Sequence, residues 1–349
     1  MLVYWILFIL VFFFFLINTL SKNKNIEILG FFISILFAIS LGCLRSNLVG
    51  TDTPGYVRDM PITVSQSVSN IFEYERDPIF WVFIKFLFLF SDSYTLYFSV
   101  LAIVFWLFSA LVIKKYAQEI FLGLLIFITF RFSDFYLNAM RQGFSIAIIM
   151  YSIKFIFDKK PINFVITVLI ASLFHNSALF FMFAYLLQYV NLQKMRLLLF
   201  VLFVFVFLTK GWLYNYVFKS LVAENGQYGL YANIESDHGI LYLILYTVTF
   251  LICSFFMKKF ENNRTFNILF NLVYIGLLLQ VITLKNVGFA RIAVYYTQYF
   301  VLIVPMVYKQ MVKDYGETKS FAFWSIFVIG LYIAGGPAPG VVPYKFFWE

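Results

Sequence analysis

The chain has 349 residues, of which 62% are hydrophobic and only 12% are charged, with a formal net charge of +9. Soluble domains carry about 25% charged residues, so this composition excludes a soluble domain as the main architecture and makes lipid the principal solvent. The excess of Lys and Arg then indicates short loops that fix the orientation in a membrane, not nucleic-acid binding. The two cysteines, Cys43 and Cys253, lie far apart in apolar stretches and indicate neither a disulfide framework nor a metal site.

Apolar segments follow one another along the whole chain. They lie near 2–20, 28–44, 78–90, 95–113, 118–131, 139–157, 162–175, 176–190, 196–209, 239–257, 265–284, 292–308 and 320–335. A span needs about 20 mostly apolar residues, and these runs are long and do not alternate, so helices are expected and a barrel is not. We predict an all-α, polytopic membrane protein of about 12 transmembrane helices (roughly 11 to 14) in a single domain over 1–349.

The basic loops predict the orientation, because Lys and Arg concentrate on the cytoplasmic side. The loops assigned to that side contain Lys22/Lys24, Lys159/Lys160, Lys194/Arg196, Lys258/Lys259 and Lys309/Lys313. Both termini and two longer loops, near 45–77 and 210–238, are then expected on the outer face. The first apolar run is expected to be a span and not a cleaved signal. Lys114/Lys115 can also lie on the cytoplasmic side only if one of the preceding segments does not cross the membrane. The short segment 78–90 is the candidate, because it could enter the membrane and return on the same side.

Polar residues that could carry chemistry collect at the expected outer face. Arg45 ends the second apolar segment, and residues 50–56 read GTDTPGY, a turn that offers Asp52 and Tyr56. Asn138, Arg141 and Gln142 follow at the start of a later segment, where the spacing i, i+3 and i+4 places them on one helix face.

Two further groups lie at outer segment ends. His175 separates two apolar runs, and an imidazole can act as a base, as an acid or as a hydrogen-bond donor to a phosphate. Arg291, Tyr295 and Gln298 form a stripe at i, i+4 and i+7. His238 follows a polar loop without an evident partner.

Several arginines at one membrane depth would repel one another without an anion. This applies to Arg45, Arg141 and Arg291, with Arg131 as a further candidate. Because a guanidinium can bind two oxygens at once, the pattern favours a phosphate or diphosphate ligand, such as a lipid head group. No Walker loop, dinucleotide fingerprint, HExxH or GxSxG sequence is present, and no metal or cofactor is implied.

The order of these motifs resembles the EpsG family of bacterial polysaccharide polymerases, which are Wzy-type O-antigen or capsule polymerases. The resemblance covers roughly 40–345, from Arg45 and GTDTPGY through NAMRQ at 138–142 and FHNSA at 174–178 to Arg291, and includes PYKFF at 343–347. It implies a multi-pass protein of the bacterial inner membrane with its active site facing outward, similar to GT-C-type membrane glycosyltransferases. Such an enzyme moves a growing glycan from undecaprenyl diphosphate to a sugar hydroxyl of a new lipid-linked repeat unit.

The resemblance and the residues together suggest roles. Arg141, Arg291 and Arg45 are candidates for binding the diphosphate, and His175 or Asp52 for the catalytic base. The candidates for substrate binding are Asn138, Gln142, Tyr56, Tyr295 and Gln298. The expected partners are lipid-linked glycans and membrane lipid, and could include a chain-length regulator and a flippase.

Two other functions stay open at this point. An O-antigen ligase-like transferase would use the same donor with a different acceptor, and its motifs could look alike. A flippase or other transporter of lipid-linked oligosaccharides would place charge through the membrane depth, whereas the Arg and His positions here cluster toward one face.

Overall fold

All regular elements in the described part of the chain are helical. The structure, a computed structural model, describes residues 1–218, 239–286, 288–336 and 340–349. Within these ranges the one strand-like pairing is an isolated bridge between Arg45 and Phe346. The all-α prediction is confirmed.

Six described helices are long and apolar enough to cross a membrane individually. They are α1 (Leu2–Ser21), α2 (Lys24–Cys43), α6 (Tyr94–Tyr116), α11 (Arg196–Trp212) with its continuation to Tyr216, α14 (Arg264–Thr283) and α17 (Glu317–Gly335). Two bent pairs raise the number to as many as eight: α7 (Ile120–Thr129) with residues 132–138, and α15 (Gly288–Thr297) with α16 (Phe300–Tyr315). The chain is therefore built as a membrane protein.

The larger predicted number includes segments that fold as shorter helices. Three apolar helices of 10–17 residues are α5 (Pro78–Phe88), α10 (Pro161–Phe174) and α13 (Gly239–Phe255). Residues 176–190 form mostly a 3-10 helix, η2 (Asn176–Tyr189). At about 2.0 Å per residue, its 14 residues extend about 28 Å, against about 21 Å as an α-helix. As a 3-10 helix, this segment therefore comes close to the roughly 30 Å thickness of the hydrocarbon core with only 14 residues. The total of about twelve crossings remains a prediction.

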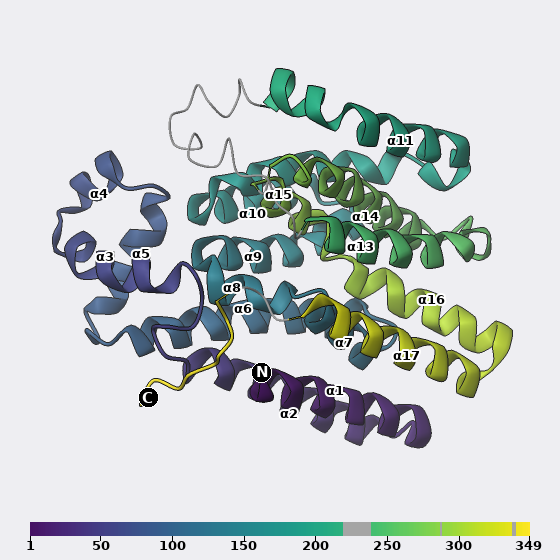
Figure 1. Ribbon diagram of the computed structural model, residues 1–349, viewed down its shortest axis with the longest axis horizontal. Coiled ribbons are helices and arrows are strands. Elements are labelled where there is room, and N and C mark those ends of the chain that lie inside the picture. The colour runs from purple at the N-terminus through teal and green to yellow at the C-terminus, as the bar shows by residue number, and fades with distance from the viewer. Residues whose placement is uncertain (219–238, 287, 337–339) are drawn as a thin grey trace.

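The segment 45–77 contains helices and joins α5 in a lobe beside the bundle. α3 (Thr53–Ser65) and α4 (Val68–Tyr74) both pack against α5 (Figure 1). Lys85 of α5 donates hydrogen bonds to the carbonyls of Val64 and Gln66, at 2.5 and 2.7 Å. The 11 residues of α5 extend only about 17 Å, about half the hydrocarbon thickness, which agrees with the expectation that 78–90 does not cross.

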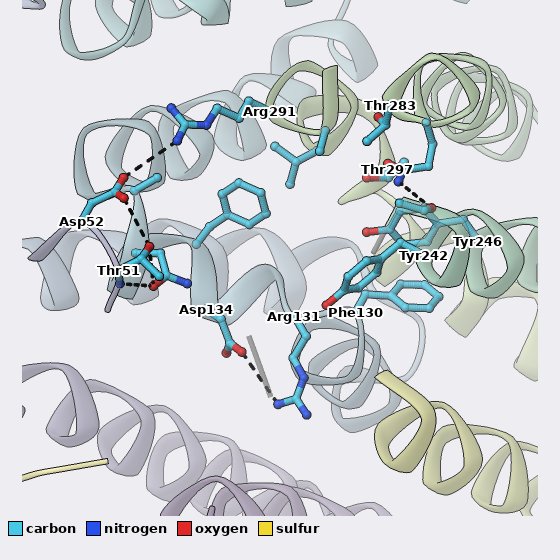
Figure 2. Close-up of a pocket in the computed structure, with 17 residues that line it drawn as sticks. Thr51, Asp52, Phe130, Arg131, Asp134, Tyr242, Tyr246, Thr283, Arg291 and Thr297 are labelled. Carbon is cyan, nitrogen blue, oxygen red and sulfur yellow. Dashed lines mark hydrogen bonds and ion pairs between the residues drawn. The ribbon is translucent and has the colours of Figure 1, made fainter. Parts of the chain in front are cut away.

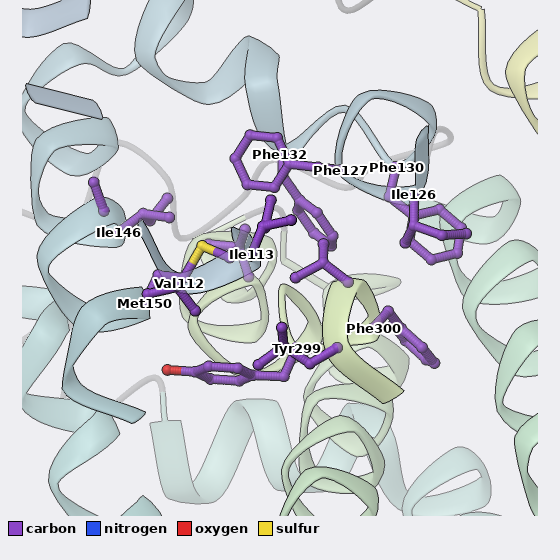
Figure 3. Packing of buried hydrophobic residues seen from close by; sticks show 14 of the residues in the cluster. Val112, Ile113, Ile126, Phe127, Phe130, Phe132, Ile146, Met150, Tyr299 and Phe300 are labelled. Carbon is purple, nitrogen blue, oxygen red and sulfur yellow. The ribbon is translucent and has the colours of Figure 1, made fainter. Parts of the chain in front are cut away.

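The two bent helix pairs lie in the packed interior. All ten residues of α7 are buried, and 78% of the apolar window of α14 is buried against 11% for the peripheral helix at 196–216. Phe130, just after α7, packs on Phe300 at the start of α16, with ring centroids 5.4 Å apart (Figure 3). Both bends lie beside this pair of aromatic rings. The short elements that follow α7, and the helix α15 that precedes α16, are therefore directed toward the same site. The remaining elements there are η1 (Phe132–Asp134), α8 (Phe135–Asn138) and α9 (Met140–Phe157).

The C-terminal tail lies against the loop that follows α2. The Tyr4 hydroxyl donates to the carbonyl of Val341 at 3.0 Å, so the first helix and the tail meet at the same end of the bundle. The amide of Gly50 donates to the carbonyl of Gly340 at 2.8 Å. Of the predicted loop 210–238, residues 210–218 continue the helix as α11 and the π-helical turn η4 (Leu213–Phe218). The rest of that loop, with His238, lies outside the described residues.

Candidate active site

A cavity of about 270 Å³ lies where several helix ends meet (Figure 2). Its walls come from the loop after α2, the break between α7 and α8, and the ends of α13, α14 and α15. The polar residues that line it are Thr51, Asp52, Arg131, Asp134, Asn138, Gln280, Thr283, Arg291 and Thr297, and its lining includes four aromatic residues, Phe130, Phe135, Tyr242 and Tyr246. Arg291 and Asp52 bring one partly exposed guanidinium and one partly exposed carboxylate to this space, whereas Arg131 and Asp134 are buried in its wall.

One ion pair in this cavity is loose and open. The Nη2 atom of Arg291 lies 3.8 Å from Oδ2 of Asp52, and the two side chains keep 31% and 40% of their surface exposed. That distance is longer than a hydrogen bond, and an exposed pair of this kind contributes little stability. This contact alone therefore does little to hold the two groups together.

The loop that carries Asp52 is fixed from two sides. The Thr51 amide donates to Oδ1 of Asn138 at 2.9 Å, and Gly50, with φ of 106°, is held by the tail. A Cβ atom at Gly50 would meet the carbonyl oxygen of Leu137 at 2.1 Å. Only glycine fits this close approach with a positive φ, so the local sequence places Asp52 at the cavity wall.

The second ion pair lies deeper. Arg131 has a left-handed backbone, with φ of 60°, at the break after α7. Its Nη1 atom lies 3.8 Å from Oδ2 of Asp134, and both side chains are 4% exposed. The guanidinium also lies over the ring of Tyr332, 4.6 Å from its centroid. This arginine is held in place by its surroundings, with Asp134 as its counter-charge.

A buried carboxylate organises a neighbouring network. The side chain of Asp77 has no exposed surface, and its Oδ2 atom lies 3.3 Å from Nη1 of Arg141, 3.3 Å from Nδ1 of His175 and 3.9 Å from Nε of Arg76. Its Oδ1 accepts from the amide of Asn176 at 3.3 Å. Asp77 precedes Pro78 at the start of α5, so the network ties the α3–α5 lobe to α9 and to the turn after α10.

The charge state of this carboxylate follows from its partners. Burial acts to raise the pKa of Asp77, but the hydrogen bond with His175 and the positive charges of Arg141 and Arg76 outweigh burial and lower the pKa below its ordinary value. Asp77 is thus ionised at neutral pH. With Nδ1 of His175 held by this carboxylate, the tautomer protonated there would leave Nε2 as an acceptor.

The network and the cavity are joined through α9 and α15. Nε2 of Gln142, next to Arg141, donates to the carbonyl of Arg291 at 2.5 Å. Arg141 itself donates from Nε to the hydroxyl of Tyr56 at 2.9 Å, and Tyr56 is on α3, one turn beyond Asp52. Movement of the buried network would therefore shift both members of the open ion pair.

A family model, described as the EpsG family, matches residues 28–346. This chain belongs to the EpsG family. Comparisons with curated proteins and with solved structures gave no match. The matched range contains both the cavity and the network around Asp77, and membership suggests a polysaccharide polymerase of glycosyltransferase type.

The structure divides the predicted site residues of this EpsG-family chain among four environments. Asp52, Asn138 and Arg291 line the cavity. Arg141, His175 and Tyr56 do not line it, and the first two meet at Asp77 in the adjoining network. Arg141 and His175 therefore meet each other at Asp77 but do not share one cavity with Arg291.

Three of the predicted substrate-binding residues lie between helices and not on the cavity wall. Gln142, Tyr295 and Gln298 are 1%, 0% and 0% exposed. The hydroxyl of Tyr295 lies 3.1 Å from Oγ of Ser177 on η2 and donates to Oγ of Ser145 on α9 at 3.3 Å. These contacts join α9, η2 and α15, so in this state these residues pack the helices that carry the site.

Arg45 is separated from the other arginines. It is 1% exposed, its Nη1 donates to the carbonyls of Leu137 and Val49 at 2.6 and 3.0 Å, and its guanidinium lies 4.2 Å from the ring centroid of Phe98. It does not line the cavity. Its donors support the backbone on which Gly50 and Asn138 depend.

Sequence reasoning missed Asp77, which has the most charged partners of the site residues described above. An Asp before a Pro at the start of an apolar run is an ordinary helix-start signal, so nothing marked it as a network centre. Gln280, Thr283 and Tyr246 were also missed, because each is one polar group within a segment that counts as apolar. Among the described residues, no group of three or more His, Cys, Asp or Glu side chains could hold a metal ion.

Proposed function

We propose that this EpsG-family chain polymerises lipid-linked oligosaccharide repeat units at the cavity that contains Asp52 and Arg291. It would transfer a growing glycan from undecaprenyl diphosphate to a sugar hydroxyl of a new lipid-linked repeat. The observation that carries the proposal is the long, partly exposed Asp52–Arg291 ion pair at the wall of this cavity. It offers a cation for the leaving group and a carboxylate for the acceptor at one place.

The leaving group needs positive charge. As the bond between the sugar carbon and the diphosphate oxygen breaks, the diphosphate takes the electron pair and negative charge develops on its oxygens. We assign its recognition to Arg291, whose planar fork can bind two phosphate oxygens. Arg131 is already paired with Asp134 in the wall of the cavity, so Arg291 is the cation that we assign to the diphosphate.

The acceptor hydroxyl forms the new bond to the sugar carbon and loses its proton. A base must lie within hydrogen-bond reach of that hydroxyl. We favour Asp52 for this role, because Asp52 lines the cavity and His175 does not. Diphosphate binding to Arg291 would release Asp52 from its ion pair and leave the carboxylate able to accept the proton.

The network around Asp77 is proposed to position these groups. Its contacts with Arg141 and His175 hold the lobe against the bundle, and Gln142 holds the backbone of Arg291. Arg141 and His175, first considered as a phosphate ligand and a base, are assigned this supporting role in the state described. His175 stays the rival base through its Nε2 atom.

The membrane setting is proposed from the basic loops. Lys-rich loops such as Lys22/Lys24 lie at the start of α2, whereas the cavity lies beyond its other end, about 30 Å away along the 20-residue helix. Since basic loops face the cytoplasm, the cavity would face the outside of a bacterial cytoplasmic membrane. About twelve crossings and a GT-C-like arrangement would be consistent with this placement, and a chain-length regulator and a flippase would be functional partners.

The test is complementation in a cell that lacks its own polymerase and makes the matching repeat unit. Wild type should give a ladder of surface glycans, and Arg291→Ala should give mainly single repeats at equal membrane level. The matched control is Arg58→Ala, which removes an arginine whose side chain is 76% exposed and pairs with Asp59. A full ladder from Arg291→Ala would contradict the assigned site.

The same gel distinguishes the alternatives. A ligase-like transferase would add glycan to a different acceptor without lengthening it, so wild type would give no ladder. A flippase would restore a ladder only in a cell that still has its own polymerase. Either result with wild type would overturn the proposed activity.

A further inference from the structure

Two adjoining cavities lie at the end of the bundle far from the active site. The first, of about 290 Å³, is lined by residues of α6 and α9, and the second, of about 530 Å³, is a groove between α2 and α6. Leu111 and Lys114 line both. The two cavities therefore share a border on α6.

Three lysines border the smaller cavity, whose other lining residues are apolar or aromatic. Its charged lining residues are Lys114, Lys115 and Lys154, and it contains no carboxylate. None of the three forms an ion pair with Asp or Glu in the part of the chain that the structure describes. Asp158 follows α9, and its carboxylate is close enough to Tyr116 to interact with it electrostatically. Asp158 itself does not line the cavity. Three like charges close together repel one another unless an anion lies between them.

The groove that continues from Lys114 is apolar. Its lining residues on α2 include Ile28, Leu29, Phe32 and Leu36, which are between 46% and 58% exposed. The lining segments 28–39 of α2 and 103–114 of α6 each extend about 17 Å along their helices. That length is about half the hydrocarbon thickness of a bilayer, or one leaflet.

We propose that these cavities bind one anionic phospholipid. Its phosphate would lie among Lys114, Lys115 and Lys154, and an acyl chain would follow the groove between α2 and α6. A negative head group above one leaflet's length of chain matches a cavity bordered by lysines at the end of an apolar groove, whereas free phosphate would leave the groove unused. The smaller cavity lies near the start of α2 and the active site beyond its other end, so this lipid is distinct from the proposed glycan donor.

The test uses the purified full-length protein in detergent. Its thermal midpoint is measured against phosphatidylglycerol, phosphatidylcholine with the same acyl chains, and inorganic phosphate. We expect a saturable rise with phosphatidylglycerol and little change with the other two. The triple variant K114Q/K115Q/K154Q should weaken the apparent affinity by about tenfold or more, because each lysine contributes separately to binding an anionic head group.

Two further variants complete the design. K258Q/K313Q/K319Q removes the same charge from the same end of the bundle at lysines outside both cavities, and should keep the wild-type response. Leu107→Trp, which narrows the groove, should weaken the phosphatidylglycerol response although all lysines remain. Equal responses of the two lysine triples, an unchanged response in Leu107→Trp, or an equal effect of phosphate alone would overturn the proposal.

Discussion

The two charged groups at the active-site end differ in almost every physical respect. Asp77 has no exposed side-chain surface and three cationic or imidazole neighbours within 3.9 Å. Asp52 is 40% exposed and meets Arg291 at 3.8 Å. A buried carboxylate must be compensated by its surroundings, because the penalty for leaving it unpaired is large. A partly exposed one can be left to water or to a ligand.

This difference teaches where stability and chemistry reside in the site. The buried network fixes the lobe, α9 and the turn after α10, and its charges are already engaged. The open pair contributes little to the fold but can exchange its partners for substrate groups. Substitutions in the first group should act mainly on stability, and substitutions in the second mainly on glycan synthesis.

The largest effect is expected from Asp77→Ala. This change leaves Arg141 and Arg76 without their buried counter-charge and should destabilise the protein by about 3–5 kcal/mol. The thermal midpoint of the purified protein and its membrane level should both fall, and the glycan ladder should be lost with them. Asp59→Ala, in the same lobe with a side chain that is 47% exposed, is the control and should behave like wild type. A stable Asp77→Ala protein would break the comparison.

The next effect is expected from Gly50→Ala. The new Cβ would lie 2.1 Å from a backbone oxygen at a residue with φ of 106°, so the loop before Asp52 must shift, at a cost of about 1–3 kcal/mol. We expect a lower thermal midpoint and a shortened ladder. Gly55→Ala is matched to it, because a Cβ at Gly55 meets nothing within 4 Å, and it should be neutral. If Gly50→Ala were equally neutral, the loop would not be fixed as described.

A smaller effect is expected from Tyr56→Phe, which removes only the hydroxyl that accepts from Nε of Arg141. The loss of one hydrogen bond to a charged group should cost about 1–2 kcal/mol, seen as a modest decrease in thermal midpoint with the ladder retained. Tyr74→Phe, at a residue that is 71% exposed, should leave the midpoint unchanged. Loss of the ladder without loss of stability would instead support the predicted role of Tyr56 in substrate binding.

Hydropathy predicted the helices well where a segment is straight. The segment 265–284 corresponds to α14 (Arg264–Thr283), because an apolar run of about 20 residues has few alternatives in lipid. It could not show where helices bend. The segments 118–131 and 292–308 are interrupted or extended by turns of 63° and 41°, which depend on packing around Phe130 and Phe300 and not on apolar content.

The site was predictable only as far as polar residues mark helix ends. Arg45 and Arg291 look alike in sequence, since each lies at the end of an apolar segment. The structure separates them, because Arg45 donates to backbone carbonyls under Phe98 whereas Arg291 faces the cavity. The role of Asp77 could not be predicted from the sequence, because its partners Arg141 and His175 are distant in sequence. Only the folding of the lobe against the bundle brings the three residues together.

The smallest effect on stability, and the sharpest on function, is expected from Asp52→Asn. The side chain makes no capping hydrogen bond to α3, and the asparagine oxygen can still accept from Oγ1 of Thr51, now at 3.2 Å from Oδ1 of Asp52. The free energy of unfolding, followed by the thermal midpoint, should therefore change by less than about 0.5 kcal/mol. The ladder should collapse to single repeats, because the asparagine amide cannot take the proton of the acceptor hydroxyl. Asp59→Asn controls for loss of one carboxylate in the same segment and should keep the full ladder. A ladder of normal length from stable Asp52→Asn would move the base to His175, and the buried network would then have to take part in the chemistry.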